Sequence, residues 1–306
     1  MSRLRPSLVA VAAALAVTAV PAAASAAPHR VTTVRYGPFV VPAMGMSTGQ
    51  AMDTGAMKSF VTKTAPPCRG CSITAMRASL VNAQNRVQNW NTGVMLHHVV
   101  LFNLARPDLT CTAGRVWKQR FFASGNERTP MRLPGGYGYR VHPRDRWRVL
   151  TDLMNMSMRP RTLYVRIRLA YTRRHLEPVT PMWLDVNNCG NSEYSIPKGR
   201  SNTTWSTRSP VSGRFVAAAG HLHDGGVRIV LRNATRHHTI VNSVAGYRRQ
   251  RHAYQGHISS MTGRRGRNLG RVRAGDTLRL HSIYDSPTAR DDVMGIVLAY
   301  LARAHR

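Results

Sequence analysis

Two histidines one residue apart stand among glycines in the stretch GHLHDGG, which runs from Gly220 to Gly226. Side chains at positions i and i+2 of a strand point to the same face, so His221 and His223 would present two imidazoles spaced to chelate one ion. The flanking glycines would let a backbone or a ligand come close. Asp224 would be placed to orient a ligating imidazole by accepting its hydrogen bond. The alternative is a pair of polar residues on a turning strand, and the spacing favours a metal site.

A second pair, His97 and His98, lies inside the apolar run GVMLHHVVLF. Adjacent residues of a regular strand face opposite sides, so both rings reach one ion only if the strand twists or bulges at this point. The alternative is a core histidine beside a surface histidine. The sequence leaves these two interpretations open.

Met294 lies in the apolar stretch DDVMGIVLAYL. A methionine in such a strand usually fills the core, but its thioether is also a soft ligand suited to Cu(I). Two imidazoles and one thioether would favour copper over calcium or magnesium. The chain lacks Walker-type, HExxH and GxGxxG motifs, so no familiar nucleotide-binding or zinc-protease signature competes with this interpretation.

The elements that must position these residues read as strands. Short apolar runs alternate with Gly, Pro, Asn and Asp, which is typical of all-β proteins, and no amphipathic helix separates them as a parallel α/β sheet would require. The predicted strands cover residues 72–81, 93–103, 146–155, 162–171, 214–223, 227–233, 276–284 and 293–302.

The chain divides into predicted segments. Residues 1–27 have a basic start, an apolar middle and a small-residue cleavage site, which predicts a signal peptide and a secreted or extracytoplasmic protein. No other stretch reaches 18 apolar residues, so no membrane span is expected. Residues 28–66 are an N-terminal extension, and a polar, proline-bounded linker separates predicted domains at 67–200 and 205–306.

Charge and cysteine content limit the partners and the compartment. Lys and Arg number 44 against 13 Asp and Glu, a net charge of +31 that would attract polyanions. Because the arginines are spread along the chain, no specific nucleic-acid recognition is predicted. In an exported protein the four cysteines suggest disulfides, here paired as Cys68 with Cys71 and Cys111 with Cys189. A redox-active or metal-binding CxxC is the alternative for the first pair.

The succession GVMLHHVVLFN, GHLHDGGVRIVL, AGDTLRLHSIYDSP and DDVMGIVLAYL resembles the stress-up-regulated nodulin-like family. More distantly, it is similar to the copper type II, ascorbate-dependent monooxygenases, which include the peptidylglycine and dopamine hydroxylases. The match covers most of residues 67–302, and the order of the short motifs carries it. The resemblance implies two consecutive antiparallel β-sandwiches of the jelly-roll kind, each holding one copper.

The resemblance also assigns ligands. In the monooxygenases the second domain binds copper through an HxH pair and a later methionine, which match His221, His223 and Met294 in this sequence. The first domain uses a tandem histidine pair, matched by His97 and His98, and a third histidine on a later strand. That strand holds no histidine here, and Met154 lies nearest to the expected position. A methionine would favour the reduced ion and change the potential for electron transfer.

The sequence therefore predicts an exported copper-binding protein, with one copper expected and a second if the first-domain site also binds. As an enzyme it would be a copper-dependent oxidase or hydroxylase acting on an unidentified small molecule or peptide. The alternatives are a non-catalytic β-sandwich module that binds a polyanion or cell wall, and a protein that scavenges copper. Whether the protein is catalytic stays open at this stage.

Overall fold

The computed structural model describes residues 29–45, 56–111, 118–187, 189, 192–247 and 256–304. The predicted signal peptide lies outside these residues. Within them the protein is all-β, as predicted, with a single-turn 3-10 helix, η1, at Trp90–Thr92. In this part of the chain, no helix is long and apolar enough to cross a membrane.

All eight predicted strands form, as β3, β4, β8, β9, β13, β14, β18 and β19. The strands of the described residues are, in chain order, β1 (Arg30–Val41), β2 (Ala56–Thr64), β3 (Ser72–Val81), β4 (Val94–Pro107), β5 (Lys118–Gly125), β6 (Met131–Arg132), β7 (Tyr137–Arg140), β8 (Trp147–Asn155), β9 (Arg161–Thr172), β10 (Glu177–Asp185), β11 (Glu193–Ile196), β12 (Gly199–Arg208), β13 (Gly213–Leu222), β14 (Gly226–Asn233), β15 (His238–Tyr247), β16 (Ile258–Met261), β17 (Gly263–Val272), β18 (Thr277–Ser286) and β19 (Arg290–Arg303).

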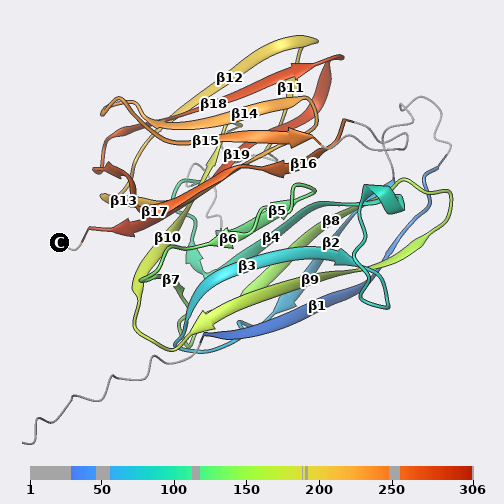
Figure 1. The fold of residues 1–306 in the computed structure, drawn as a ribbon, viewed down its shortest axis with the longest axis horizontal. Coiled ribbons are helices and arrows are strands. Elements are labelled where there is room, and N and C mark those ends of the chain that lie inside the picture. The colour runs from blue at the N-terminus through green and yellow to red at the C-terminus, as the bar shows by residue number, and fades with distance from the viewer. Residues whose placement is uncertain are drawn as a thin grey trace, which may run out of the picture.

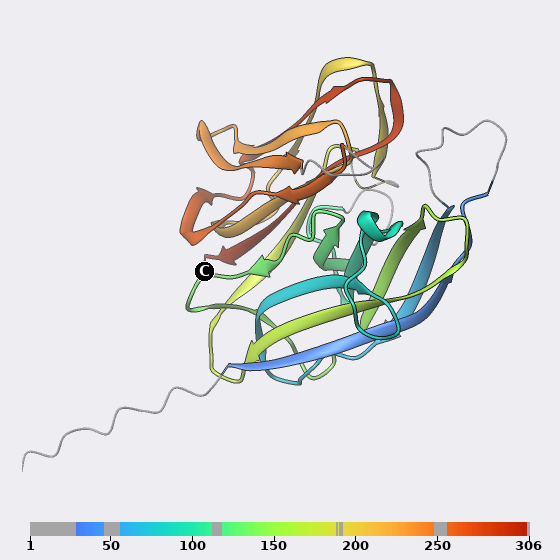
Figure 2. The same ribbon diagram turned by 45° about the vertical axis from the view of Figure 1, so that its right-hand side comes forward.

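The strands form three sheets. The largest follows the order β1-β9-β3-β7-β10-β19-β13-β17, with β6 on β3 and β11 on β19; a second follows β12-β18-β14-β15-β16, and a third β2-β8-β4-β5. In Figures 1 and 2 the second sheet lies uppermost, with β13, β17 and β19 beneath it. The third sheet lies below these strands, and β1, β3 and β9 form the lowest layer.

Strands β13 and β19 are buried on both faces because they separate two hydrophobic cores. Along β19, Leu298 and Tyr300 belong to the core shared with the third sheet, whereas Val297 and Leu301 belong to the core under the second sheet. A strand that is buried on both faces has an almost continuous apolar sequence, which explains the stretch MGIVLAYLA in β19.

The two predicted domains, 67–200 and 205–306, stay a prediction. Their strands meet in one sheet, where β10 pairs antiparallel with β19 from Val179 opposite Ala302 to Asp185 opposite Ile296. The predicted extension contributes edge strands: β1 pairs with β9 and β2 pairs with β8.

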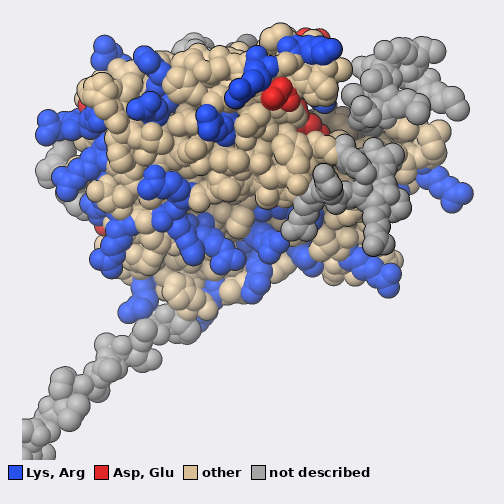
Figure 3. All heavy atoms as spheres, turned by 45° about the horizontal axis from the view of Figure 1, so that its top comes forward, with Lys and Arg blue, Asp and Glu red and all other residues tan. Residues whose placement is uncertain are grey.

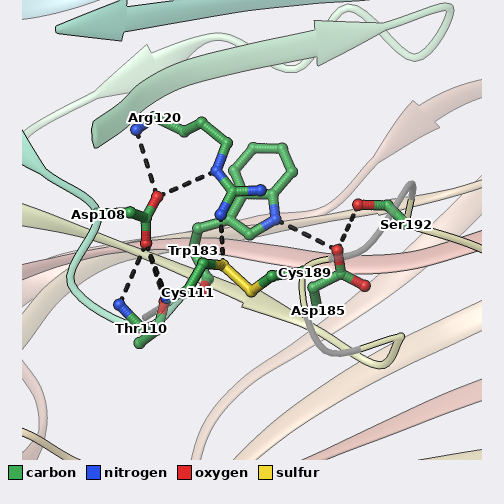
Figure 4. A network of polar contacts seen from close by, with 8 residues as sticks. All are labelled: Asp108, Thr110, Cys111, Arg120, Trp183, Asp185, Cys189 and Ser192. Carbon is green, nitrogen blue, oxygen red and sulfur yellow. Dashed lines mark hydrogen bonds and ion pairs between the residues drawn. A yellow bond between two sulfur atoms is a disulfide. The ribbon is translucent and has the colours of Figure 1, made fainter. Parts of the chain in front are cut away.

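Both predicted disulfides are confirmed, Cys68–Cys71 and Cys111–Cys189. The second lies in the polar network of Figure 4. There Arg120 donates to the Asp108 carboxylate at 3.0 Å and lies over the ring of Trp183 at 4.4 Å. This network fastens β5 and the segment after β4 to β10.

Candidate metal centre

The tandem histidines of β4 lie at a β-bulge. Leu96 pairs with Leu153 on β8, but His98 pairs with Asp152, so His97 is an extra residue in the ladder. The bulge that shared ligation by both rings would require is present, and the ring centroids of His97 and His98 lie 4.1 Å apart.

The second pair lies at the end of β13, where His221 is in the strand and His223 follows its last residue. The His223 backbone is held firmly: its N–H donates to the Tyr284 hydroxyl at 2.9 Å, and that hydroxyl donates to the Met294 carbonyl at 2.6 Å. At Gly225, φ is +87°, a conformation that glycine adopts without strain, so the chain turns here.

All four imidazoles converge. The His98 Nε2 atom lies 3.0 Å from His221 Nε2 and 3.1 Å from His223 Nε2. Ligand atoms of His97, His98 and His223 lie within 4.8 Å of one another. The residues of the two predicted sites thus share one place between β4 and β13, called here the four-histidine cluster (His97, His98, His221 and His223).

Carboxylates lie beside the Nδ1 atoms of two of these rings. Glu127 Oε2 lies 3.3 Å from His221 Nδ1, and Asp152 Oδ2 lies 3.5 Å from His98 Nδ1. Each carboxylate favours the Nδ1–H tautomer and so leaves a lone pair on Nε2, where a metal would bind. Sequence reasoning missed both acids. The register of β8 brings Asp152 to the histidines, and the turn after β5 brings Glu127 to them.

Burial keeps three of the four cluster histidines, His97, His98 and His223, neutral. Burial, with the nearby His221, lowers the pKa of His97 to about 4. Burial likewise sets the pKa of His98 and of His223 well below the usual value. Burial alone would raise the pKa of Glu127, but His221 and the Gly125 N–H, which donates to its carboxylate at 2.8 Å, lower it. Three of the four imidazoles, those of His97, His98 and His223, are therefore held neutral near an acid with a lowered pKa, and neutral imidazole is the form that binds a metal.

The donor set fits a transition metal. Zinc, for comparison, binds imidazole nitrogen at about 2.0 to 2.1 Å, so two nitrogens on one ion lie roughly 3 to 4 Å apart. The Nε2 atoms of His98 and His221, 3.0 Å apart, lie within that range, and a cation between them would be bound by both rings. In addition, His97 Nδ1 is buried without a hydrogen-bond partner among the described residues. Imidazole donors suit copper, zinc, iron and nickel.

The two predicted methionine ligands lie in different surroundings. Met294 is buried and lines, with His98 and His221, a cavity of about 480 Å³. Met154 packs against Trp90, Met95 and Met156 in a small cluster of its own. Ligation by either methionine stays a prediction, and Met294 has the closer association with the histidines.

The prediction for Asp224 is wrong in its partner. Its carboxylate accepts hydrogen bonds from His257 Nδ1 and, at 2.7 Å, from the Ile258 N–H, and so it orients a histidine outside the cluster. At Gly220 a Cβ would lie 2.3 Å from Ile229 on the facing sheet, so packing requires glycine there, and Gly220 also lines the cavity.

Comparison with known proteins gives sequence relatives. No protein-family model matches the chain. The chain is 28% identical over 298 residues to the "Probable copper-dependent oxygenase M1" of Phoma sp., covering 90% of this chain and 73% of that protein. It is 28% identical over 251 residues to the "Probable copper-dependent oxygenase clz3" of Cochliobolus lunatus, covering 74% of this chain and 78% of that protein. The chain is a distant relative of copper oxygenase-like proteins.

A solved structure aligns much more weakly. The crystal structure of the major capsid protein P2 from bacteriophage PM2 matches with a TM-score of 0.34 and 11% identity, covering 89% of this chain and 99% of that chain. A likeness at this level carries no argument about this protein.

Proposed function

We propose that this protein is an exported copper-dependent oxygenase whose copper is held by the four-histidine cluster. The observation that carries the proposal is the approach of His98 Nε2 to both His221 Nε2 and His223 Nε2, at 3.0 and 3.1 Å. The relationship to proteins named as copper-dependent oxygenases selects copper among the metals that imidazole suits. When bound, copper would supply one-electron redox chemistry with oxygen and an external reductant.

In this proposal the chain supplies position and protonation state. Glu127 and Asp152 each hold an Nδ1 proton, so that the Nε2 atoms of His221 and His98 stay free to bind. The hydrogen bond that links the His223 backbone to Tyr284 keeps the third ring in place. Met294 is the candidate sulfur ligand, since it lines the same cavity as the histidines.

The exported location and the nodulin-like family membership belong to the proposal as well. Residues 1–27 have the pattern of a signal peptide, and the two disulfides, Cys68–Cys71 and Cys111–Cys189, are compatible with an oxidising compartment.

The experiment is copper binding by His98→Ala. Because His98 is the ring that meets both partners, its loss should lower Cu(I) affinity at least tenfold, measured by competition with a chromogenic chelator. The control is His142→Ala, which removes an exposed histidine outside the cluster and should leave affinity unchanged. Unchanged binding by a folded His98→Ala protein would refute the shared centre.

Turnover is tested separately. The copper-loaded protein, supplied with ascorbate, should take up oxygen above the rate of free copper at the same concentration, and His98→Ala should not. Tight Cu(I) binding without oxygen uptake in the presence of candidate substrates would favour the scavenging role over the oxygenase.

A further inference from the structure

The cavity beside the four-histidine cluster lies between two facing sheets. His98, Val100 and Phe102 alternate along β4, with Leu150 opposite Val100 on β8, and all four line one wall. His221 pairs with Ile296 across β13 and β19, and Leu298 and Tyr300 continue along β19 to form the other wall. The cavity is therefore a slot between strands that is lined by three of the candidate copper ligands, His98, His221 and Met294.

Small side chains on β13 leave the slot open. Ala219 pairs with Leu298 and Ala217 with Tyr300, so both alanines share a face with His221 and line the cavity. The volume of about 480 Å³ falls within the range of small-molecule sites, roughly 300 to 1,000 Å³. Most of the side chains that line the slot are apolar, among them Val100, Leu150 and Leu298, so the slot suits a hydrocarbon body.

The acidic and basic side chains that line the cavity lie in different surroundings. Its two acids, Glu127 and Asp152, both lie against cluster histidines. Arg265 on β17 pairs with Ala217, and so extends from the face that the cavity occupies. Arg265 and Arg132 both line the cavity and are exposed, and within the described residues neither forms an ion pair. Two further arginines line the cavity: Arg120 pairs with Asp108, and Arg264 donates to backbone carbonyls of β15. Arg265 and Arg132 are therefore the two guanidinium groups of the lining that the described residues leave available to a ligand.

We propose that the substrate is an apolar small molecule that carries one anionic group, such as a carboxylate. Its hydrocarbon body would lie in the slot, with a C–H position toward His98 and His221, and its anion would meet Arg265 and Arg132 at the opening. A guanidinium and a carboxylate form charge-assisted hydrogen bonds, which fix the direction in which the molecule enters. This inference deepens the proposed function and rests on it for the identity of the bound molecule as a substrate.

The test uses metal-free protein, so that it does not depend on copper chemistry. Decanoate, 1-decanol and decyltrimethylammonium share the apolar chain and differ in charge, and their binding is measured by isothermal titration calorimetry at 150 mM salt. Decanoate should bind about tenfold more tightly than the alcohol and tighter still than the cation. Its binding should show the negative heat-capacity change of apolar burial.

Three variants locate the site. Ala219→Phe fills the slot and should weaken decanoate at least tenfold while leaving the Cu(I) affinity within about threefold. Arg265→Ala should weaken decanoate about tenfold and leave 1-decanol unchanged. Arg271→Ala removes an exposed arginine from the same strand, away from the cavity, and should change neither.

The outcomes separate this inference from the proposed function. Equal affinities for decanoate and 1-decanol would overturn the inference that the ligand carries an anionic group. Equal losses of decanoate affinity in Arg265→Ala and Arg271→Ala would overturn it as well. Full decanoate binding by Ala219→Phe would overturn the cavity as the site. If the protein bound no copper or took up no oxygen, but bound decanoate and its analogues as expected, only the proposed oxygenase function would be refuted.

Discussion

At the scale of single residues, the chemistry depends on which nitrogen of each ring carries the proton. The acids that set it, Glu127 in the turn after β5 and Asp152 in β8, lie far in sequence from His221. Such partners are commonly as important as the ligands, because they fix both tautomer and ring orientation.

Glu127→Gln tests this role. The neutral amide keeps the shape of the carboxylate but holds the Nδ1 proton of His221 less firmly, so copper affinity should fall by about 10- to 100-fold, measured by chelator competition. Glu177→Gln is the control, because its carboxylate pairs with Arg214 outside the cluster. Equal affinities for the two variants would show that Glu127 only packs against the ring.

At the scale of elements, β5 must lie unusually close to the end of β13. A Cβ at Gly125 would lie 2.6 Å from Glu127 Oε2, 2.8 Å from the His97 carbonyl and 2.9 Å from His221 Cε1. These are distances that real Cβ atoms do not show, so glycine is required where β4, β5 and the histidines meet.

Gly125→Ala should therefore displace the cluster. The expected result is at least a tenfold loss of copper affinity, with destabilisation of about 1 to 3 kcal/mol from overpacking. Gly135→Ala is a matched control, because nothing lies within 4 Å of its added Cβ. If chelator competition and urea unfolding gave the same values for both variants, the close approach would not matter.

Asp276 anchors the start of β18. Its carboxylate accepts from the Arg273 N–H at 2.9 Å, from Asn233 at 2.9 Å and from Arg236 at 2.6 Å. Burial would raise the pKa of Asp276, but these hydrogen bonds lower it to about 2. A lowered pKa means that the carboxylate stabilises the fold above its unfolded pKa of about 3.9 and that this stability is lost as the pH falls toward 2.

Asp276→Asn should thus be less stable than the parent at pH 6, by about 1 to 2 kcal/mol. The difference should shrink between pH 4 and pH 2, as the parent carboxylate takes up its proton. Urea unfolding at several pH values measures both, and Asp285→Asn, at an exposed position on the same strand, should show no such trend. A difference that does not depend on pH would refute the ionic role.

At the scale of the whole molecule, the two cysteine pairs differ in the loops that they close. Cys111–Cys189 spans 78 residues and joins the segment after β4 to the connection between β10 and β11, whereas Cys68–Cys71 spans 3. In the chain-entropy account the disulfide that closes the longer loop stabilises the folded state by about 4 kcal/mol, and the disulfide that closes the shorter loop by about 2 kcal/mol. The Arg120 network of Figure 4 surrounds the longer one.

Replacing Cys111 and Cys189 by serine should accordingly cost more stability than replacing Cys68 and Cys71, measured by thermal and urea unfolding. The larger loss is expected also because Arg120 lies beside Cys111 and over Trp183. Equal costs would show that loop length does not decide the contribution of these bridges.

The basic charge is a property of the whole surface. Figure 3 shows blue side chains spread over the visible face, with few red ones among them. This spread agrees with the distribution of arginines along the sequence, and polyanion contact stays a prediction.

The sequence by itself determined the all-β class, eight of the strands and the presence of disulfides, and it singled out the histidines as candidate ligands, because alternation, cysteine count and histidine spacing are local or compositional signals. It predicted two separate groups of ligands, one per domain. Only the tertiary structure decided that His98 meets His221 and His223, that Glu127 and Asp152 hold the rings, and that Asp224 serves His257 instead. These contacts depend on how two sheets face each other, and no spacing within a single strand carries that information.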